Sequence, residues 1–229
     1  FTSTSAVSFP TYSITFKTPQ TISFGTLADK TFGDADFALS ATATSGLSVS
    51  YASSNPSVAT ISGNTVQIVG AGTTTITASQ SGDATYAAAV DVPQTFTVGK
   101  ANQTITGLAA TDSKTYGDST YSPSASSTSG LSITYASSNT SVATVSGNII
   151  SIVGAGTTTI TASQAGDSNY NPATSVDQSL TVVPKALTIT ASDAIKPFGT
   201  TWTGGSGSTA FTSSGLVGVE TIGSVTISY

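Results

Sequence analysis

The chain has 229 residues, a formal net charge of −5, and no Cys, Met or His. Without His or Cys, the Ser-His and Cys-His nucleophile pairs of many hydrolases cannot form within it, and zinc lacks its usual ligands. All six basic residues are scattered lysines, which cannot supply the basic face that nucleic-acid binding requires. No run of about 18 apolar residues occurs, so we expect no membrane-spanning segment.

The first residues resemble the end of a repeating module. Residues 7–17 (VSFPTYSITFK) overlay residues 90–100 (VDVPQTFTVGK). Residues 1–18 are therefore predicted to be the closing strand or strands of a preceding, partial module.

Residues 19–100 are predicted to form a first complete module. Apolar and hydroxyl side chains alternate with a period of two, as in Leu47, Val49 and Tyr51. This alternation indicates strands with one buried and one wet face. Ser62, Gly63 and Asn64 are typical of a tight hairpin connection. About seven short strands in one module is the pattern of an immunoglobulin-like sandwich.

Residues 101–184 repeat this module. Residues 135–170 match residues 51–86 at 28 of 36 positions with an offset of 84. Residues 185–189 (KALTI) then restart the opening strand, and residues 185–229 are predicted to be a partial third module. The predicted fold class is all-β, with tandem immunoglobulin-like antiparallel β-sandwiches in a linear array.

An Asp-x-x-Tyr motif precedes the last strand of each complete module. It consists of Asp83 and Tyr86 in the first module and Asp167 and Tyr170 in the second. The placement resembles the tyrosine corner of sandwich folds, in which the hydroxyl bonds to upstream backbone and fixes a strand crossing. We predict a structural role for all four residues.

The repeated motif SSN-x-SVAT-(I/V)-SGN, followed by IVGAGTTTITASQ-x-GD-x-x-Y, resembles the bacterial immunoglobulin-like (Big-type) repeats. The third unit, with KALTITASD and a Phe-Gly turn at Phe198, is similar to MBG-type repeats, although it has Lys-Pro-Phe-Gly in place of the more usual Tyr-Gly. The resemblance implies a secreted protein of the bacterial cell surface. It brings no catalytic residues and no cofactor, because its pattern defines a fold.

The acidic residues offer few candidates for chemistry. The densest cluster is Asp29, Asp34 and Asp36, a weak calcium candidate because calcium needs six to eight oxygen ligands. The second module has Thr120 where Asp36 stands, which favours solvated loop acids over a metal site. Acids that recur by repeat position are typical of turns, so no enzyme activity is expected.

These features predict a structural spacer or stalk in a repetitive bacterial adhesin, projecting a distal binding region. The alternatives are a module that itself binds a glycan or a cell-surface partner, and an accessory domain of a secreted enzyme. Positions that differ between the modules, such as Thr65/Ile149 and Ala84/Ser168, are scattered and do not cluster at one end. The expected partners are neighbouring repeats of the same chain.

Overall fold

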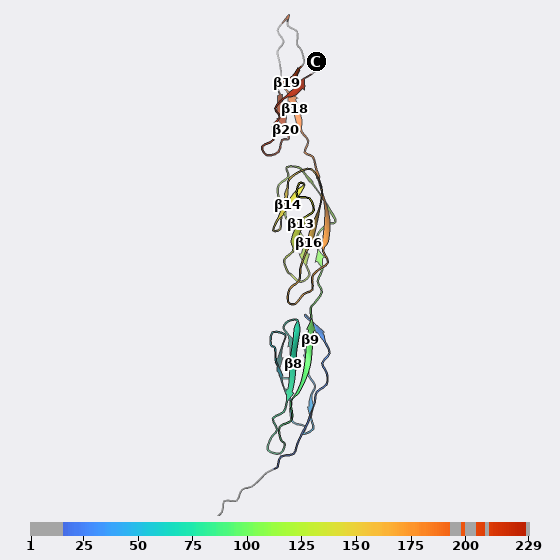
Figure 1. Cartoon of the computed structure of the whole chain (residues 1–229), viewed down its shortest axis with the longest axis vertical. Helices are drawn as coiled ribbons and strands as arrows, with labels where there is room; N and C mark the ends of the chain where they lie inside the picture. Colours follow the sequence, from blue (N-terminus) through green and yellow to red (C-terminus); the bar gives the residue numbers. More distant parts are fainter. Residues whose placement is uncertain (1–15, 193–197, 200–204, 209–210, 228–229) are drawn as a thin grey trace, which may run out of the picture. The chain divides into compact units, whose positions relative to one another are not determined.

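A computed structural model describes residues 16–192, 198–199, 205–208 and 211–227 (Figure 1). All the regular elements in these residues are β-strands. They belong to two compact units. The first runs to Ala101 and also holds Asp167–Tyr170, and the second holds Asn102–Gly166 and the described residues from Asn171 onward. The predicted all-β class with tandem immunoglobulin-like sandwiches is confirmed.

The main sheet of the first unit has four strands. Their order is β2, β9, β8 and β5, with bounds Lys30–Thr31, Val92–Gly99, Gly72–Ser79 and Ser50–Ser53. The long strands β8 and β9 pair along most of their length and are antiparallel, whereas the short β2 runs parallel to β9 (Figure 1).

The second sheet of the first unit covers the inner face of the main sheet. Its order is β3, β7 and β6, with bounds Phe37–Ala38, Thr65–Ile68 and Ala59–Ser62. A separate antiparallel pair joins β1 (Ile22–Ser23) to β4 (Thr42–Ala43). Buried residues of both sheets, among them Val66, Ile76 and Phe96, form one continuous core. Removal of this apolar surface from water is the main force that holds the two sheets together.

The second unit repeats this arrangement. Its main sheet has the order β11, β17, β16 and β13, with bounds Thr111–Thr115, Val176–Val183, Gly156–Ser163 and Thr134–Ser137. The facing hairpin joins β14 (Ala143–Ser146) to β15 (Ile149–Ile152), and β10 (Ile105–Thr106) pairs with β12 (Ser126–Ser127). A single bridge between Tyr121 and Ile150 stands where the first unit has the β3–β7 ladder.

The sequence explains the hairpins and the direction of the side chains. Gly63 and Gly147 both have φ of 61°, which glycine adopts without the steric penalty of a β-carbon, and each closes its two-residue hairpin turn. Ile76 and Ala78 of β8 face the core, as the alternation predicts. Thr74 lies on the same face of β8 and is also buried, although its side chain is polar. Its Oγ1 atom accepts a hydrogen bond from the backbone N–H of Asn55 at 3.0 Å, which satisfies the buried hydroxyl.

Two further strand pairs follow the second sandwich. β18 (Thr188–Ala191) pairs with β20 (Phe211–Ser214), and β19 (Gly205–Ser208) pairs with β21 (Val225–Ile227). The predicted closing strand over residues 1–18 falls almost wholly on residues outside the described ones, as does the Lys196–Pro197 part of the Phe-Gly turn. The MBG-like character of residues 185–229 stays a prediction.

Candidate functional site

The Asp-x-x-Tyr motifs form two closed loops with the same internal hydrogen bonds. In the first loop (residues 83–86), the Asp83 carboxylate accepts the backbone N–H groups of Thr85 at 2.8 Å and of Tyr86 at 2.7 Å. These two donors, Tyr86 first, lower the pKa of the Asp83 carboxyl group, because they stabilise its charged form. The ionised Asp83 side chain therefore closes the loop by accepting hydrogen bonds from the backbone of the same loop.

The second loop (Asp167–Tyr170) repeats this closure. The Asp167 carboxylate accepts the N–H groups of Asn169 at 2.7 Å and of Tyr170 at 2.8 Å. The Asp167 N–H in turn donates to the Tyr170 carbonyl at 3.1 Å. The structural role predicted for these residues, with a bond from each tyrosine hydroxyl to upstream backbone, stays a prediction.

A buried pair of glutamines holds the base of each loop, which sequence reasoning missed. In the first unit, Gln20 Nε2 donates to Gln80 Oε1 and to the Ala87 carbonyl, both at 2.6 Å. Gln80 Oε1 also accepts the N–H of Gly82 at 2.5 Å. Gly82 and Ala87 flank the loop on its two sides, so one buried amide network closes it.

The second unit has an equivalent network. Gln103 Nε2 donates to Gln164 Oε1 at 2.5 Å and to the Asn171 carbonyl at 2.7 Å, and Gly166 N–H donates to Gln164 Oε1. All four glutamines are less than a tenth exposed. The signal available in the sequence was the recurrence of both glutamines in the second repeat, Gln20 after 83 residues and Gln80 after 84.

The tyrosine whose hydroxyl bonds to upstream backbone is Tyr51 of β5. Its Oη atom accepts the backbone N–H of Ala41, ten residues earlier, at 2.7 Å. Its ring also packs against Phe24, with ring centroids 5.7 Å apart. Tyr51 thus anchors β5 to an upstream segment of the first unit.

The three acids of the calcium candidate lie on exposed positions. Asp34 Oδ2 accepts the N–H of Thr31 at 2.9 Å, and Asp118 does the same for Thr115 at 2.7 Å in the second unit. Asp34 is thus a turn-closing residue, while Asp29 and Asp36 are solvent-exposed. Within the described residues, no group of three or more His, Cys, Asp or Glu side chains is placed to hold a metal ion.

A lysine lies over an aromatic ring at the same place in both units. Lys30 Nζ is 5.5 Å from the centroid of the Phe37 ring, and Lys114 Nζ is 4.5 Å from that of Tyr121. The Tyr121 hydroxyl is buried and has no hydrogen-bond partner. Burial raises the pKa of Tyr121 to about 12.

Trp202, the single tryptophan of the sequence, lies outside the described residues. No helix long and apolar enough to cross a membrane occurs in the part of the chain that the structure describes.

No protein-family model and no curated protein matches the sequence. Several solved structures align with this chain at low TM-scores. The S-layer protein SbsC domains 4 and 5 are 21% identical with a TM-score of 0.30, over 59% of this chain and 77% of that one. SbsC domains 1–6 are 13% identical with a TM-score of 0.32, over 92% of this chain and 40% of that one, so this chain spans well under half of that structure. Drosophila N-cadherin EC1-3 is 12% identical with a TM-score of 0.31, over 73% of this chain and 68% of that one.

Because these identities and TM-scores are low, the fold assignment is based on the strands and cores described above and not on these alignments. The resemblance to Big-type and MBG-type repeats stays a prediction, since no family model matches.

Proposed function

We propose that this chain is a structural segment of a repetitive, secreted protein of the bacterial cell surface. Its repeats act as non-catalytic spacers that hold an adhesive region away from the cell. The observation that carries the proposal is the pattern of differences between the two sister repeats, which lie mainly at exposed positions and keep the volume of the core.

Residues 51–86 and 135–170 differ at eight positions. Six of the eight positions are solvent-exposed in the first unit. These six differences are Pro56/Thr140, Thr65/Ile149, Gln67/Ser151, Ser81/Ala165, Ala84/Ser168 and Thr85/Asn169. A binding surface shared by both repeats would be expected to keep exposed residues, whereas a spacer needs only the residues that build the fold.

The remaining two differences compensate each other inside the core. Ile61 of β6 is the cross-strand partner of Val66 of β7. In the second unit the partners are Val145 and Ile150. One methylene has moved from one strand to the other, so the pair keeps its volume. Close-packed interiors tolerate volume-conserving exchanges best, so the pattern is that expected where packing is the property retained.

The proposal is tested by exchanging the repeats in the parent protein displayed on cells. Replacement of residues 51–86 by the sequence of residues 135–170 should leave attachment unchanged, because a spacer contributes length and stability. Deletion of one whole 84-residue repeat should reduce attachment by shortening the segment, and insertion of an unrelated sandwich domain of equal length should restore it. Failure of the unrelated domain to restore attachment would show that the repeat itself binds a partner.

A glycan array probed with this chain alone separates the spacer from the binding alternative. We expect no saturable binding above that of an unrelated sandwich domain. Saturable binding to a glycan class, abolished by denaturation of the chain, would overturn the spacer proposal.

A further inference from the structure

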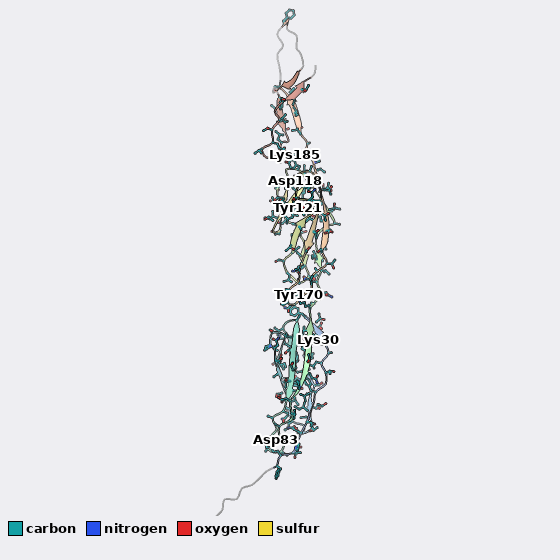
Figure 2. The ribbon with its side chains drawn as sticks, in the orientation of Figure 1. Lys30, Asp83, Asp118, Tyr121, Tyr170 and Lys185 are labelled. Carbon is teal, nitrogen blue, oxygen red and sulfur yellow. The ribbon has the colours of Figure 1, made fainter. Side chains whose placement is uncertain are left out.

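The second loop contributes to the first unit although it lies in the sequence of the second repeat. Asp167–Tyr170 belongs to the first compact unit. Figure 2 shows the labelled Tyr170 at the same end of that unit as Lys30, while Asp83 of the first loop lies at its other end. The first unit thus carries one Asp-x-x-Tyr loop of its own and receives another at the opposite end.

The residues that receive the second loop are Phe32, Gly70 and Ala71, here called the acceptor end. The Tyr170 ring packs edge-on against the Phe32 ring, with centroids 5.5 Å apart and an interplanar angle of 85°. Asn169 Oδ1 accepts the backbone N–H of Ala71 at 2.9 Å. An edge-to-face ring pair and a hydrogen bond to an otherwise unpaired amide are both directional, so they fix a defined contact.

The space at Gly70 is also adapted to this contact. A β-carbon built at Gly70 would lie 3.3 Å from Asn169 Oδ1 and 2.7 Å from the Ser57 carbonyl oxygen. The first distance is tight and the second is a clash, so only glycine lets the backbone approach both groups. The clash with the Ser57 carbonyl, which recurs between Gly154 and the Ser141 carbonyl at 2.6 Å, requires glycine by itself, and the absence of a side chain also leaves room for Asn169.

At the corresponding end of the second unit, the aromatic residue also contacts a loop that is closed by an acidic side chain. There, Tyr116 takes the place of Phe32, and its hydroxyl donates to Glu220 Oε1 at 3.0 Å. Glu220 lies in a third loop (residues 217–220), in which its Oε2 atom accepts the Val217 N–H at 3.0 Å. A hollow of about 350 Å³ at this place is lined by Tyr116, Gly154, Ala155, Leu216 and Glu220, among others.

The second and third loops have unrelated sequences but the same construction. Each has four residues and an acid whose carboxylate binds a backbone N–H of its own loop. Each also contacts the aromatic residue of the acceptor end in its own unit. Two occurrences within one chain make a chance packing contact a poor explanation for either.

We propose that the Phe/Tyr-Gly end of each repeat is a docking surface whose partner is the acid-closed loop of another repeat of the same kind. Through this contact, the stability of one repeat depends on the next. By its identical closure, the first loop (residues 83–86) is a ligand for the acceptor end of a further repeat. The inference rests on the proposed function in one respect: the docking partner is another repeat of the same protein.

The test is made on the whole chain by hydrogen exchange measured with NMR, which reports each amide separately. Asn169→Thr replaces the amide oxygen that accepts the Ala71 N–H by a hydroxyl on a shorter side chain, and it installs the residue that the first loop has at the same position, Thr85. We expect exchange of the Ala71 amide to rise about 3- to 10-fold, the effect of losing one hydrogen bond. The amide of Ile160, in the core of the second unit, should be unchanged.

A double-mutant cycle tests the ring contact. Phe32→Ala and Tyr170→Ala should each accelerate exchange of the Ala71 amide, and the double variant should add little to either. Tyr86→Ala is the matched control, because the first loop has the same closure and its labelled Asp83 lies at the opposite end of the unit (Figure 2). Additive effects of Phe32→Ala and Tyr170→Ala, or an equal effect of Tyr86→Ala on Ala71, would overturn the proposal.

The extension to the first loop has its own variant. Ser168→Ala with Asn169→Thr converts the second loop to the sequence of the first (DATY) while leaving the rest of the chain intact. The nuclear Overhauser contacts between the Phe32 and Tyr170 rings should persist in this variant. Loss of these contacts, with the second unit still folded, would show that the first loop is not a ligand of this kind. A positive glycan array would overturn the spacer function and leave these exchange results unaffected.

Discussion

The exchanged methylene in the hairpin of β6 and β7 predicts a specific non-additivity. Ile61 and Val66 are cross-strand partners in the first unit; Val66 is fully buried and Ile61 packs against the core. The second unit has the reverse arrangement, with Ile150 fully buried and Val145 beside it. The perturbation is to install the second arrangement in the first unit, one residue at a time and then together.

Each single substitution should destabilise the first unit. Ile61→Val removes one methylene from a half-buried position and should lower the free energy of unfolding by about 0.5–1 kcal/mol. Val66→Ile adds a methylene where no side-chain surface is exposed, and overpacking of this kind lowers it by about 1–3 kcal/mol. The double variant restores the total volume and should lie within about 0.5 kcal/mol of the unaltered chain, because the added group fills the space that the other change leaves.

Native-state hydrogen exchange in low denaturant measures the effect within one sample. The amide of Ile76 in β8 reports the opening of the first unit, and the equivalent amide of Ile160 in β16 is the internal reference. If the double variant is destabilised by the full sum of its two single changes, the two side chains do not share one volume, and the compensation argument fails.

Four further results are expected. Tyr121→Phe should stabilise the second unit by about 1 kcal/mol in urea unfolding, because it removes a buried hydroxyl that has no partner. The new residue is the phenylalanine that the first unit has at the equivalent position, Phe37. Burial raises the pKa of Tyr121 to about 12, above the value of about 10 in an unfolded chain, so the unfolded chain loses this proton first and the stability of the second unit falls as the pH rises from 10 to 12. Melting curves of Tyr121→Phe should lack this part of the alkaline loss, and equal losses in both chains would contradict the assignment. Gln164→Ala should lower the free energy of unfolding of the second unit by about 2–3 kcal/mol, as it leaves the buried Gln103 amide without one acceptor. Gln67→Ala, at an exposed position, is its control. A chelator should leave the melting temperature unchanged, and a fall of several degrees would reinstate a calcium site around Asp34.

The strands were predictable because their information is local. A period of two in Ile76 and Ala78 of β8 specifies which face is buried, whatever the partner strand is. The turn at Gly63 was predictable for the same reason, since its positive φ is a property of one residue and its neighbours. The 84-residue offset then implied that both repeats share one fold.

The polar interior was not predictable in this way. Gln20 and Gln80 are 60 residues apart, and nothing in the local pattern says that their amides meet. Thr74 shares the core-facing side of β8 with Ile76 and Ala78, as the alternation implies, but nothing local indicates that its hydroxyl meets the amide of Asn55, 19 residues away. The role of such a residue depends on the hydrogen-bond partner that the tertiary structure places beside it.

By itself, the sequence of this chain determined its class, its repeats and the position of its Asp-x-x-Tyr loops, because alternation, turn residues and self-similarity act over short distances along the chain. Only the tertiary structure decided what those loops contact. The Phe32 ring meets Tyr170 across 138 residues of sequence, and the Ala71 amide meets Asn169 across 98. A directional contact of this kind depends on where the folded backbone places each group, and no local preference encodes that placement.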